Sequence, residues 1–350
     1  MKTITQYPCG VIPHYILERV AEHSGSSPAV DARSTLEQMR DAASIRMLAL
    51  LDHQLPPEAF PVRRKKIAVF DARGGRKLPG KLVLDCHRSY KPDLEARQAF
   101  RGAVDTWDFF ADVFGRRSID GRGCRLISTV HYGHHFANAM WNGEQMVYGD
   151  GDGRFITSFT ASPEVIAHEL THGFIQHALG LGYTGQTGAV NESFSDVLAI
   201  LAAQYRRRVK VRDADWTIGA GLFGPGVNAR GVRSLSEPGS AYDDPILGRD
   251  PQPRHMRDYV DTPEDNGGVH INSGIPNVAF YRVAMAIGGY AWGPAGKIWY
   301  VALTHRLTND AQFDDLALAT FDVAGELYGF GGRFQKIVAE AWDSVGLPCY

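Results

Sequence analysis

Two histidines and three acidic side chains, set on two neighbouring helical segments, constrain this chain more than any other feature. His168 and His172 stand four residues apart, and Glu169 follows the first of them. Residues four apart in a helix lie on one face, so both imidazoles would project together. Glu192 and Asp196 repeat the same spacing further along the chain. A fold that packs these two faces together would gather two imidazoles and two carboxylates around one point.

Such a set matches the ligands of a catalytic zinc ion, which takes three protein ligands and leaves a fourth position for water. We expect His168, His172 and Glu192 to bind zinc, and Asp196 to orient a ligating histidine. Glu169 would take a proton from the attacking water, whose pKa the metal lowers. The pattern from 168 to 172 also arises by chance, and an acidic pair in a first helical turn also complements the helix dipole. The prediction of a zinc site therefore rests on the two segments taken together.

A rival class of zinc site adds a third histidine to the same helix, with a glycine before it. In this chain those positions hold Ala178 and Ile175, so that class is excluded. His177 is one residue away and would lie on a different helical face. We expect it to be a surface or packing residue.

Length and composition indicate a soluble protein of two domains. The chain has 350 residues, of which 44% are apolar and 22% charged, with a net charge of −2. We therefore expect no nucleic-acid partner and no anionic membrane partner. No apolar run is long enough to cross a bilayer. We expect a monomer.

The N-terminal residues 1–10 lack the basic and then apolar pattern of a Sec signal peptide. We expect secretion by a leaderless route, with cytoplasmic residence as the alternative. The four cysteines are scattered, without the paired spacing of a metal site, and inert thiols are expected. The open alternative concerns Cys9, whose thiolate would silence the enzyme by taking the water position at the zinc.

The expected elements change along the chain from strands to helices. Residues 12–17 look extended, 24–28 form a loop, 35–51 a helix and 54–66 an exposed linker. Strands are expected at 67–72, 81–84 and 124–131, with a helix at 93–114 and a hairpin turn at Asn142–Gly143. The later helices are expected at 165–179, capped by Ser162 and Pro163, and at 190–205, 275–287, 295–307 and, as a pair, within 314–345.

Several motifs together resemble the thermolysin family of neutral metalloproteases, from about Ile67 to the C-terminus. They lie at 70–72 and 78–80, 138–153, 168–172, 188–196, 233–238 and 265–274. The resemblance implies an α+β fold of two domains, β-rich first and mainly α-helical second, with zinc between them. The implied domains are a short propeptide at 1–50, whose boundary lies between 43 and 66, and peptidase domains at 51–185 and 186–350.

The resemblance also implies roles for residues outside the zinc helices. Tyr183 and His270 would stabilise the oxyanion that forms during peptide hydrolysis, and Asp265 would orient His270. Asn138 and Ala139 would pair with the substrate backbone, and Arg233 would bind a substrate carbonyl. The positions that line the pocket after the scissile bond are all apolar: Ile156, Phe159, Val165 and Val232. We therefore expect cleavage on the amino side of bulky hydrophobic residues.

The chain departs from thermolysin at the paired calcium site beside the zinc helices. Glu164 and Asp215 remain, but other ligand positions hold Ala203, Thr217 and Ala220, and a basic segment, 206–210, lies between. Calcium takes six to eight oxygen ligands, so we expect calcium to be absent or weakly bound.

Residues 12–17 resemble the short propeptide motif of the protealysin subgroup, with His14 in place of one proline. The implied role is a removable inhibitor that lies over the catalytic cleft. The leading function is thus a self-processing zinc endopeptidase acting on polypeptides. The alternatives are a zinc exopeptidase, for which no feature capturing a chain terminus is evident, and a silent zinc protein that binds peptides. The presence of Glu169 and His270 argues against the last.

Overall fold

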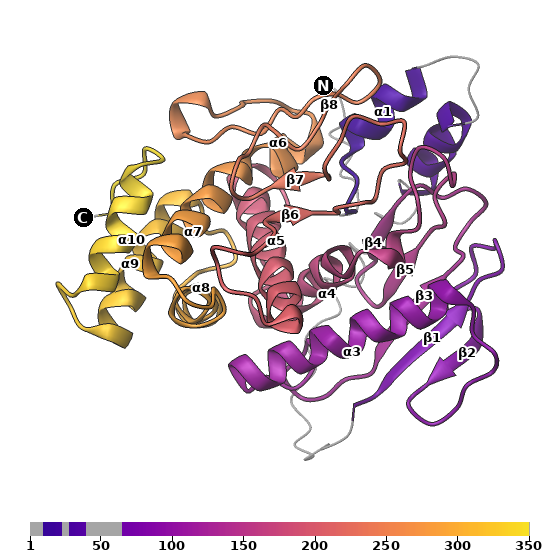
Figure 1. Cartoon of the computed structure of the whole chain (residues 1–350), viewed down its shortest axis with the longest axis horizontal. Helices are drawn as coiled ribbons and strands as arrows, with labels where there is room; N and C mark the ends of the chain where they lie inside the picture. The colour runs from indigo at the N-terminus through magenta and orange to yellow at the C-terminus, as the bar shows by residue number, and fades with distance from the viewer. Residues whose placement is uncertain (1–9, 23–27, 40–64, 350) are drawn as a thin grey trace.

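The computed structural model describes residues 10–22, 28–39 and 65–349. A five-stranded sheet occupies one end of the molecule, and helices fill the other end (Figure 1). Its strands are β1 (Ile67–Asp71), β2 (Lys81–Asp85), β3 (Leu126–Val130), β4 (Ala139–Trp141) and β5 (Met146–Tyr148). The spatial order is β2-β1-β3-β5-β4. The three inner strands run parallel, and the two edge strands run antiparallel to their neighbours. Strand β4 therefore has one edge open for pairing.

Helix α3 (Leu94–Phe114) packs on the sheet at β1, β2 and β3. It begins where Asp93 accepts a hydrogen bond from the Ala96 amide, and it ends at Gly115 in the left-handed conformation. Its buried side chains include Ala96, Ala103 and Phe110, spaced at helical intervals. The predicted helix at 93–114 is confirmed.

Helices α4 (Pro163–Ala178) and α5 (Gly185–Arg207) lie side by side at the centre of the molecule. Ser162 caps α4 through the Val165 amide, and Pro163 takes the first helical position, as the sequence predicts. Helix α5 is longer than the predicted 190–205. Every residue from 188 to 204 is buried, because this helix is surrounded by other elements instead of facing solvent on one side.

The remaining helices form the mainly helical half. They are α6 (Asp265–Asn272), α7 (Gly274–Ile287), α8 (Pro294–His305), α9 (Phe313–Tyr328) and α10 (Arg333–Asp343). Two small antiparallel pairs, β6 (Thr217–Ile218) with β7 (Arg233–Ser234) and β8 (Asp243–Asp244) with β9 (Gly248–Arg249), lie before them in the chain. The predicted α+β class, strands first and helices second, is confirmed.

The N-terminal segment corrects one prediction. The sequence predicts an extended element at 12–17, but helix α1 runs from His14 to Glu22. Pro13 precedes the helix, and its carbonyl accepts bonds from the Ile16 and Leu17 amides. A fixed φ makes proline a suitable helix start. A second helical stretch covers 28–39, so it begins before the predicted residue 35. Most of the predicted loop at 24–28, the rest of the helix to 51 and most of the linker at 54–66 lie outside the described residues.

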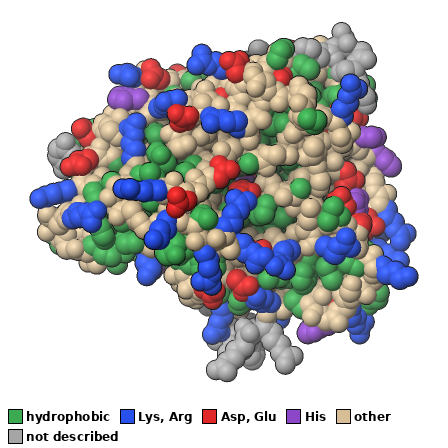
Figure 2. Space-filling view, in the orientation of Figure 1, with side chains coloured by type: hydrophobic (Ala, Val, Ile, Leu, Met, Phe, Trp, Pro, Cys, Tyr) green, Lys and Arg blue, Asp and Glu red, His purple; other side chains and the backbone are tan. Residues whose placement is uncertain are grey.

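The surface mixes charges of both signs. Figure 2 shows acidic and basic side chains interspersed over one face of the molecule, in keeping with the small net charge. Among the described helices, none combines the length and the apolar character needed to span a membrane.

Candidate metal centre

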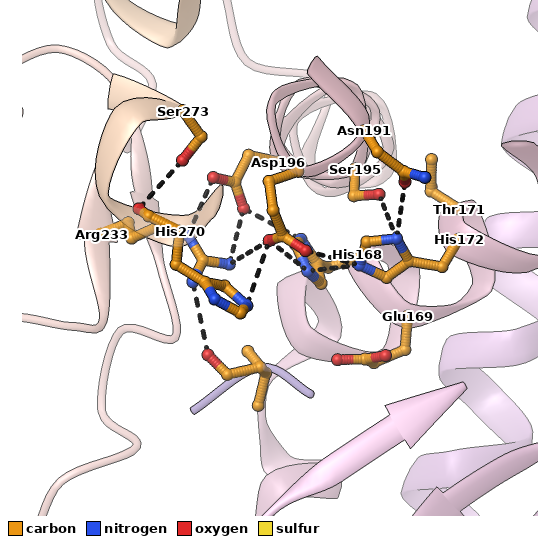
Figure 3. Close-up of polar contacts among 12 residues, drawn as sticks. His168, Glu169, Thr171, His172, Asn191, Ser195, Asp196, Arg233, His270 and Ser273 are labelled. Carbon is orange, nitrogen blue, oxygen red and sulfur yellow. Dashed lines mark hydrogen bonds and ion pairs between the residues drawn. The ribbon is translucent and has the colours of Figure 1, made fainter. Parts of the chain in front are cut away.

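Three buried side chains from α4 and α5 bring their donor atoms together (Figure 3). The Nε2 atoms of His168 and His172 face each other at 3.0 Å. The Glu192 carboxylate lies 3.5 Å from the first of these atoms and 3.3 Å from the second. Ligands bound to tetrahedral zinc at about 2.0–2.1 Å would stand about 3.3 Å from one another. The donor types and their spacing therefore fit a zinc ion.

The outer nitrogens of both histidines are held by α5. His168 Nδ1 lies 2.9 Å from Asp196 Oδ1. His172 Nδ1 lies 2.9 Å from Asn191 Oδ1 and 3.0 Å from Ser195 Oγ. These contacts turn each Nε2 toward the centre. The sequence predicts the contact of Asp196 but misses Asn191 and Ser195. They too are four apart, and each precedes a predicted acidic residue, so helical spacing could have found them.

Asp196 lies at the middle of a buried ionic network. Arg233 donates to both of its carboxylate oxygens at 2.9 Å, and the Asn277 amide donates to Oδ2 at 2.9 Å. Burial raises the pKa of Asp196, but Arg233 and His168 outweigh this effect and hold the pKa at about 2. The ionised carboxylate thus keeps both His168 and Arg233 in fixed positions.

Glu169 faces strand β4 instead of α5. It is fully buried, and its Oε2 accepts a 2.8 Å hydrogen bond from the Trp141 amide. In Figure 3 its carboxylate lies on the other side of the two histidines from Asn191 and Ser195. The sequence does not predict the contact with Trp141, because it involves a main-chain group.

His270 is presented by an unusual turn at the start of α6. Four consecutive residues, 265–268, have positive φ angles of 54°, 53°, 88° and 74°. This left-handed turn lets the Asp265 carboxylate accept from the His270 amide at 2.8 Å and lie 2.6 Å from its Nδ1. Burial lowers the pKa of His270, but Glu192 and Asp265 raise it more, so the pKa lies above its usual value.

Tyr183 completes the ring of polar groups. Its hydroxyl donates to Glu192 and lies 3.4 Å from His270 Nε2. His270 Nε2 lies 3.6 Å from Glu192. The structure therefore brings together all seven residues that the sequence assigns to zinc binding and hydrolysis, together with Asp196, from α4, α5, α6 and the loop between α4 and α5. Their individual roles stay predictions.

The N-terminal segment pairs with the predicted substrate-binding residues. The Val11 amide donates to the Ala139 carbonyl at 3.1 Å, and Arg233 donates to the Val11 carbonyl at 3.4 Å. The Asn138 side chain bonds Ile12 twice, accepting from its amide and donating to its carbonyl, each at 3.0 Å. The open edge at the start of β4 thus holds a two-residue segment through one main-chain bond and the Asn138 side chain.

The structure gives the burial of the remaining predicted residues but does not test their roles. Ile156, Phe159, Val165 and Val232 are all buried, with exposed fractions of 3% or less. Their contact with a substrate side chain stays a prediction. His177 lies on the exposed side of α4, as expected. Cys9 falls outside the described residues, so its predicted contact is untested.

Comparison with known proteins shows matches over nearly the whole chain. The family model described as thermolysin metallopeptidase, catalytic domain, matches residues 50–176, and the model of the alpha-helical domain matches 179–347. An extracellular metalloprotease of Pectobacterium carotovorum is 43% identical over 97% of this chain and 96% of its own length. Protease PrtS of Photorhabdus is 40% identical over 97% and 92%. The solved precursor of protealysin from Serratia proteamaculans is 43% identical, has a TM-score of 0.85, and is matched over 97% of this chain and 99% of its own.

Proposed function

We propose that this chain, which belongs to the thermolysin family of zinc metalloendopeptidases, is made as an inactive precursor and processes itself. It then cleaves polypeptides on the amino side of bulky hydrophobic residues. The carrying observation is the pairing of Val11 and Ile12 with Asn138, Ala139 and Arg233 beside the buried His168, His172 and Glu192. The proposed precursor consists of a prosegment at 1–50 and peptidase domains at 51–185 and 186–350.

The chain's own groups can carry out the hydrolysis in a defined order. His168, His172 and Glu192 would hold the zinc ion, which would supply Lewis-acid polarisation of the carbonyl and activation of water. Glu169 accepts the proton of the attacking water and then gives it to the departing amine. His270, kept cationic by Asp265, and the Tyr183 hydroxyl donate to the oxyanion of the tetrahedral intermediate. The buried surroundings strengthen each of these contacts.

The substrate is held by the groups that now hold the prosegment. In an extended substrate, one residue would donate to the Ala139 carbonyl and accept from Arg233, as Val11 does. The next residue would take both atoms of the Asn138 amide, as Ile12 does. By the family resemblance of Asn138, Ala139 and Arg233, we assign Val11 the place of the residue after the scissile bond. A fully buried apolar side chain there supports the proposed preference for hydrophobic residues.

The prosegment would keep the precursor silent because it occupies the backbone contacts that a substrate needs. The similar Serratia structure is that of a precursor, and the Pectobacterium relative is named an extracellular metalloprotease. By similarity we propose that this chain is likewise processed and works outside the cell.

Mass spectrometry of the purified protein incubated alone tests the proposal directly. We expect the wild-type chain to lose its N-terminal segment at a bond between 43 and 66 and then to hydrolyse casein. The Glu169→Ala variant should stay intact and inactive. Equal processing of both proteins would show that another protease is responsible. Failure of the processed wild type to hydrolyse casein would favour a silent peptide-binding protein, and release of single terminal residues would favour an exopeptidase.

A peptide-library digest tests the specificity. We expect bulky hydrophobic residues such as Leu, Phe or Ile to dominate just after the cleaved bond. A library profile dominated by charged residues at that position would overturn the register derived from Val11.

A further inference from the structure

Gln176 of α4 holds the segment that leaves strand β4. Its Oε1 accepts a 2.9 Å hydrogen bond from the Trp141 indole Nε1, and its Nε2 donates to the Gly143 carbonyl at 3.1 Å. Gln176 lies seven residues after Glu169, which is two helical turns, so both residues share one face of α4.

Trp141 is attached to this face at two points. Its main-chain amide donates to Glu169, and its indole donates to Gln176. Gly173 lies between these points, and a Cβ atom there would come within 3.0 Å of the indole ring. The ring therefore packs closely against the helix, with only 2% of Trp141 exposed.

Strand β4 is short, and different segments bind in turn along one of its edges. It has three residues, and it pairs with β5 along the other edge. Near its start, Asn138 and Ala139 receive the prosegment, and a substrate would replace it there. The occupant of this edge therefore changes during activation and turnover, while the Trp141 amide must stay against the Glu169 carboxylate.

We propose that Gln176 is a positioning residue for peptide hydrolysis. Through the Trp141 indole it keeps the Trp141 amide in contact with Glu169, and this contact fixes the orientation of the carboxylate that accepts the proton. The inference rests on the proposed role of Glu169. Substrate contacts at Asn138 and Ala139 lie at the other end of the strand, where Ala139 pairs with Tyr148. The loss of Gln176 should thus lower kcat and leave KM nearly unchanged.

A volume-conserving substitution separates the hydrogen bonds from the packing. Gln176→Met removes both bonds and retains the side-chain length. We expect kcat of the processed, zinc-loaded variant to fall roughly tenfold, with KM within about twofold, because one hydrogen bond to a charged group is at stake. Gln176→Glu keeps an acceptor for the indole and should recover most of the lost kcat.

Gln335 supplies a matched control far from the site. It is buried where Gln176 is half-buried, it accepts from the Gly331 amide at 2.7 Å, and it donates to the Phe321 carbonyl at 3.2 Å. Gln335→Met makes the same chemical change in α10. It should lower the thermal midpoint to a similar extent and leave kcat unchanged. Equal kcat in the wild type and Gln176→Met, or an equal loss in both methionine variants, would overturn the proposal.

The Trp141→Phe variant tests the route through the indole. It removes the indole donor and retains the aromatic body and the main-chain amide. We expect the loss in kcat to match that of Gln176→Met, and the double variant to lose no more than either single variant. Additive losses would show that Gln176 does not act through Trp141. The thermal unfolding midpoints of the same four proteins should show the same non-additivity without any assay of activity.

The Glu169→Ala variant keeps the two proposals distinct. If it retains turnover, the proposed role of Glu169 fails whatever the Gln176 variants do. If it is inactive while Gln176→Met keeps its full kcat, the positioning proposal alone fails.

Discussion

At the scale of single residues, His131 joins two parts of the chain that lie far from it in sequence. Its Nδ1 is 2.8 Å from Asp150, and its Nε2 is 2.9 Å from Asp93, the cap of α3. The hydrogen bond with Asp150 is the largest cause that raises the pKa of His131 to about 9, and Asp93 adds to it against the effect of burial. The imidazole is therefore cationic at neutral pH and bridges two carboxylates.

His131 should make stability depend on pH in a known direction. Its pKa is higher in the folded protein than the usual 6.5 of the unfolded chain. The stabilisation is thus complete below pH 6.5 and disappears as the pH rises through 9. His131→Asn suits the positive φ of this position. It should lower the free energy of unfolding by roughly 1–2 kcal/mol at pH 6 and by almost nothing at pH 10. Urea unfolding in the Glu169→Ala background measures this, and a difference that does not vary with pH would contradict it.

The left-handed turn before His270 depends on glycine at 267. Gly267 has a φ of 88°, and a Cβ atom there would lie 2.8 Å from the Gly185 amide nitrogen. Gly331 has a φ of 69° with open space around it, so Gly331→Ala should show the conformational cost alone, about 1–2 kcal/mol. Gly267→Ala should cost about twice as much and also lower kcat, because the turn positions His270. Thermal unfolding and kinetics of both variants check this; equal effects would show that the close contact is unimportant.

Single residues also mark the limit of sequence reasoning at this site. His168, His172 and Glu192 could be predicted because their spacing is local to two helices and their chemistry is specific to a metal. Trp141 could not be predicted as a partner of Glu169, since its contact uses a main-chain amide that any residue would supply. The contacts of Gln176 could not be predicted from the sequence either, because its partners lie at a strand that is brought to α4 only by the tertiary fold.

At the scale of elements, an ion pair joins α4 to the end of α5 where thermolysin has calcium ligands. Arg207 Nη2 lies 3.0 Å from Glu164 Oε1, and Ser162 donates to the other oxygen of Glu164 at 3.1 Å. Glu164 is 4% exposed, so its charge needs a nearby partner. The basic segment 206–210, which the sequence shows at this place, supplies that partner within the protein.

Arg207 should therefore stabilise the packing of α4 on α5 in the absence of calcium. Arg207→Ala should lower the free energy of unfolding by about 1–2 kcal/mol, since it leaves a buried carboxylate without its guanidinium. Arg306→Ala removes the exposed pair with Glu326 and should cost much less, because solvent screens an exposed ion pair. The thermal midpoint of the wild type should stay flat as calcium is added up to millimolar concentration. A large rise would show that calcium binds there after all.

The N-terminal elements show why local patterns can mislead. Val11, Ile12 and Pro13 do form a short non-helical segment, and the sequence extends it too far. His14, Tyr15, Ile16 and Leu17 are all buried in α1, and a run of four consecutive buried residues shows neither a helical nor a strand period. The cleft surface that buries this run comes from residues more than 100 positions later, and no local signal reveals it.

At the scale of the whole molecule, the zinc-site residues come from both halves, and the N-terminal segment bonds to both, at Asn138 and Ala139 in the first half and at Arg233 in the second. Helix α1 docks on the helical half beyond the cleft. Arg19 donates to the Leu247 carbonyl at 2.6 Å, and Tyr242 donates to Tyr15 at 3.3 Å. The glycine at 248 leaves room for the Arg19 side chain, because a Cβ atom at this position would collide with the guanidinium. Gly248 thus permits this contact. The N-terminal segment thus contacts the protein both beside the zinc-site residues and away from them, and we propose that both sets of contacts contribute to latency.

Arg19 offers a test of this arrangement that leaves the mature enzyme unchanged. If cleavage falls between 43 and 66, the Arg19→Ala precursor yields a mature protein identical in sequence to the wild type. We expect this precursor to gain casein-hydrolysing activity several-fold sooner, because a charged donor to a part-buried carbonyl contributes about 1 kcal/mol or more to docking. The Glu22→Ala precursor is the control, since that side chain lies exposed at the end of α1. Time courses of activity, read beside the fraction of processed chain, separate faster cleavage from faster release. Identical courses for the Arg19 and Glu22 variants would mean that the prosegment inhibits through Val11 and Ile12 alone, and that the docking of α1 has no part in latency.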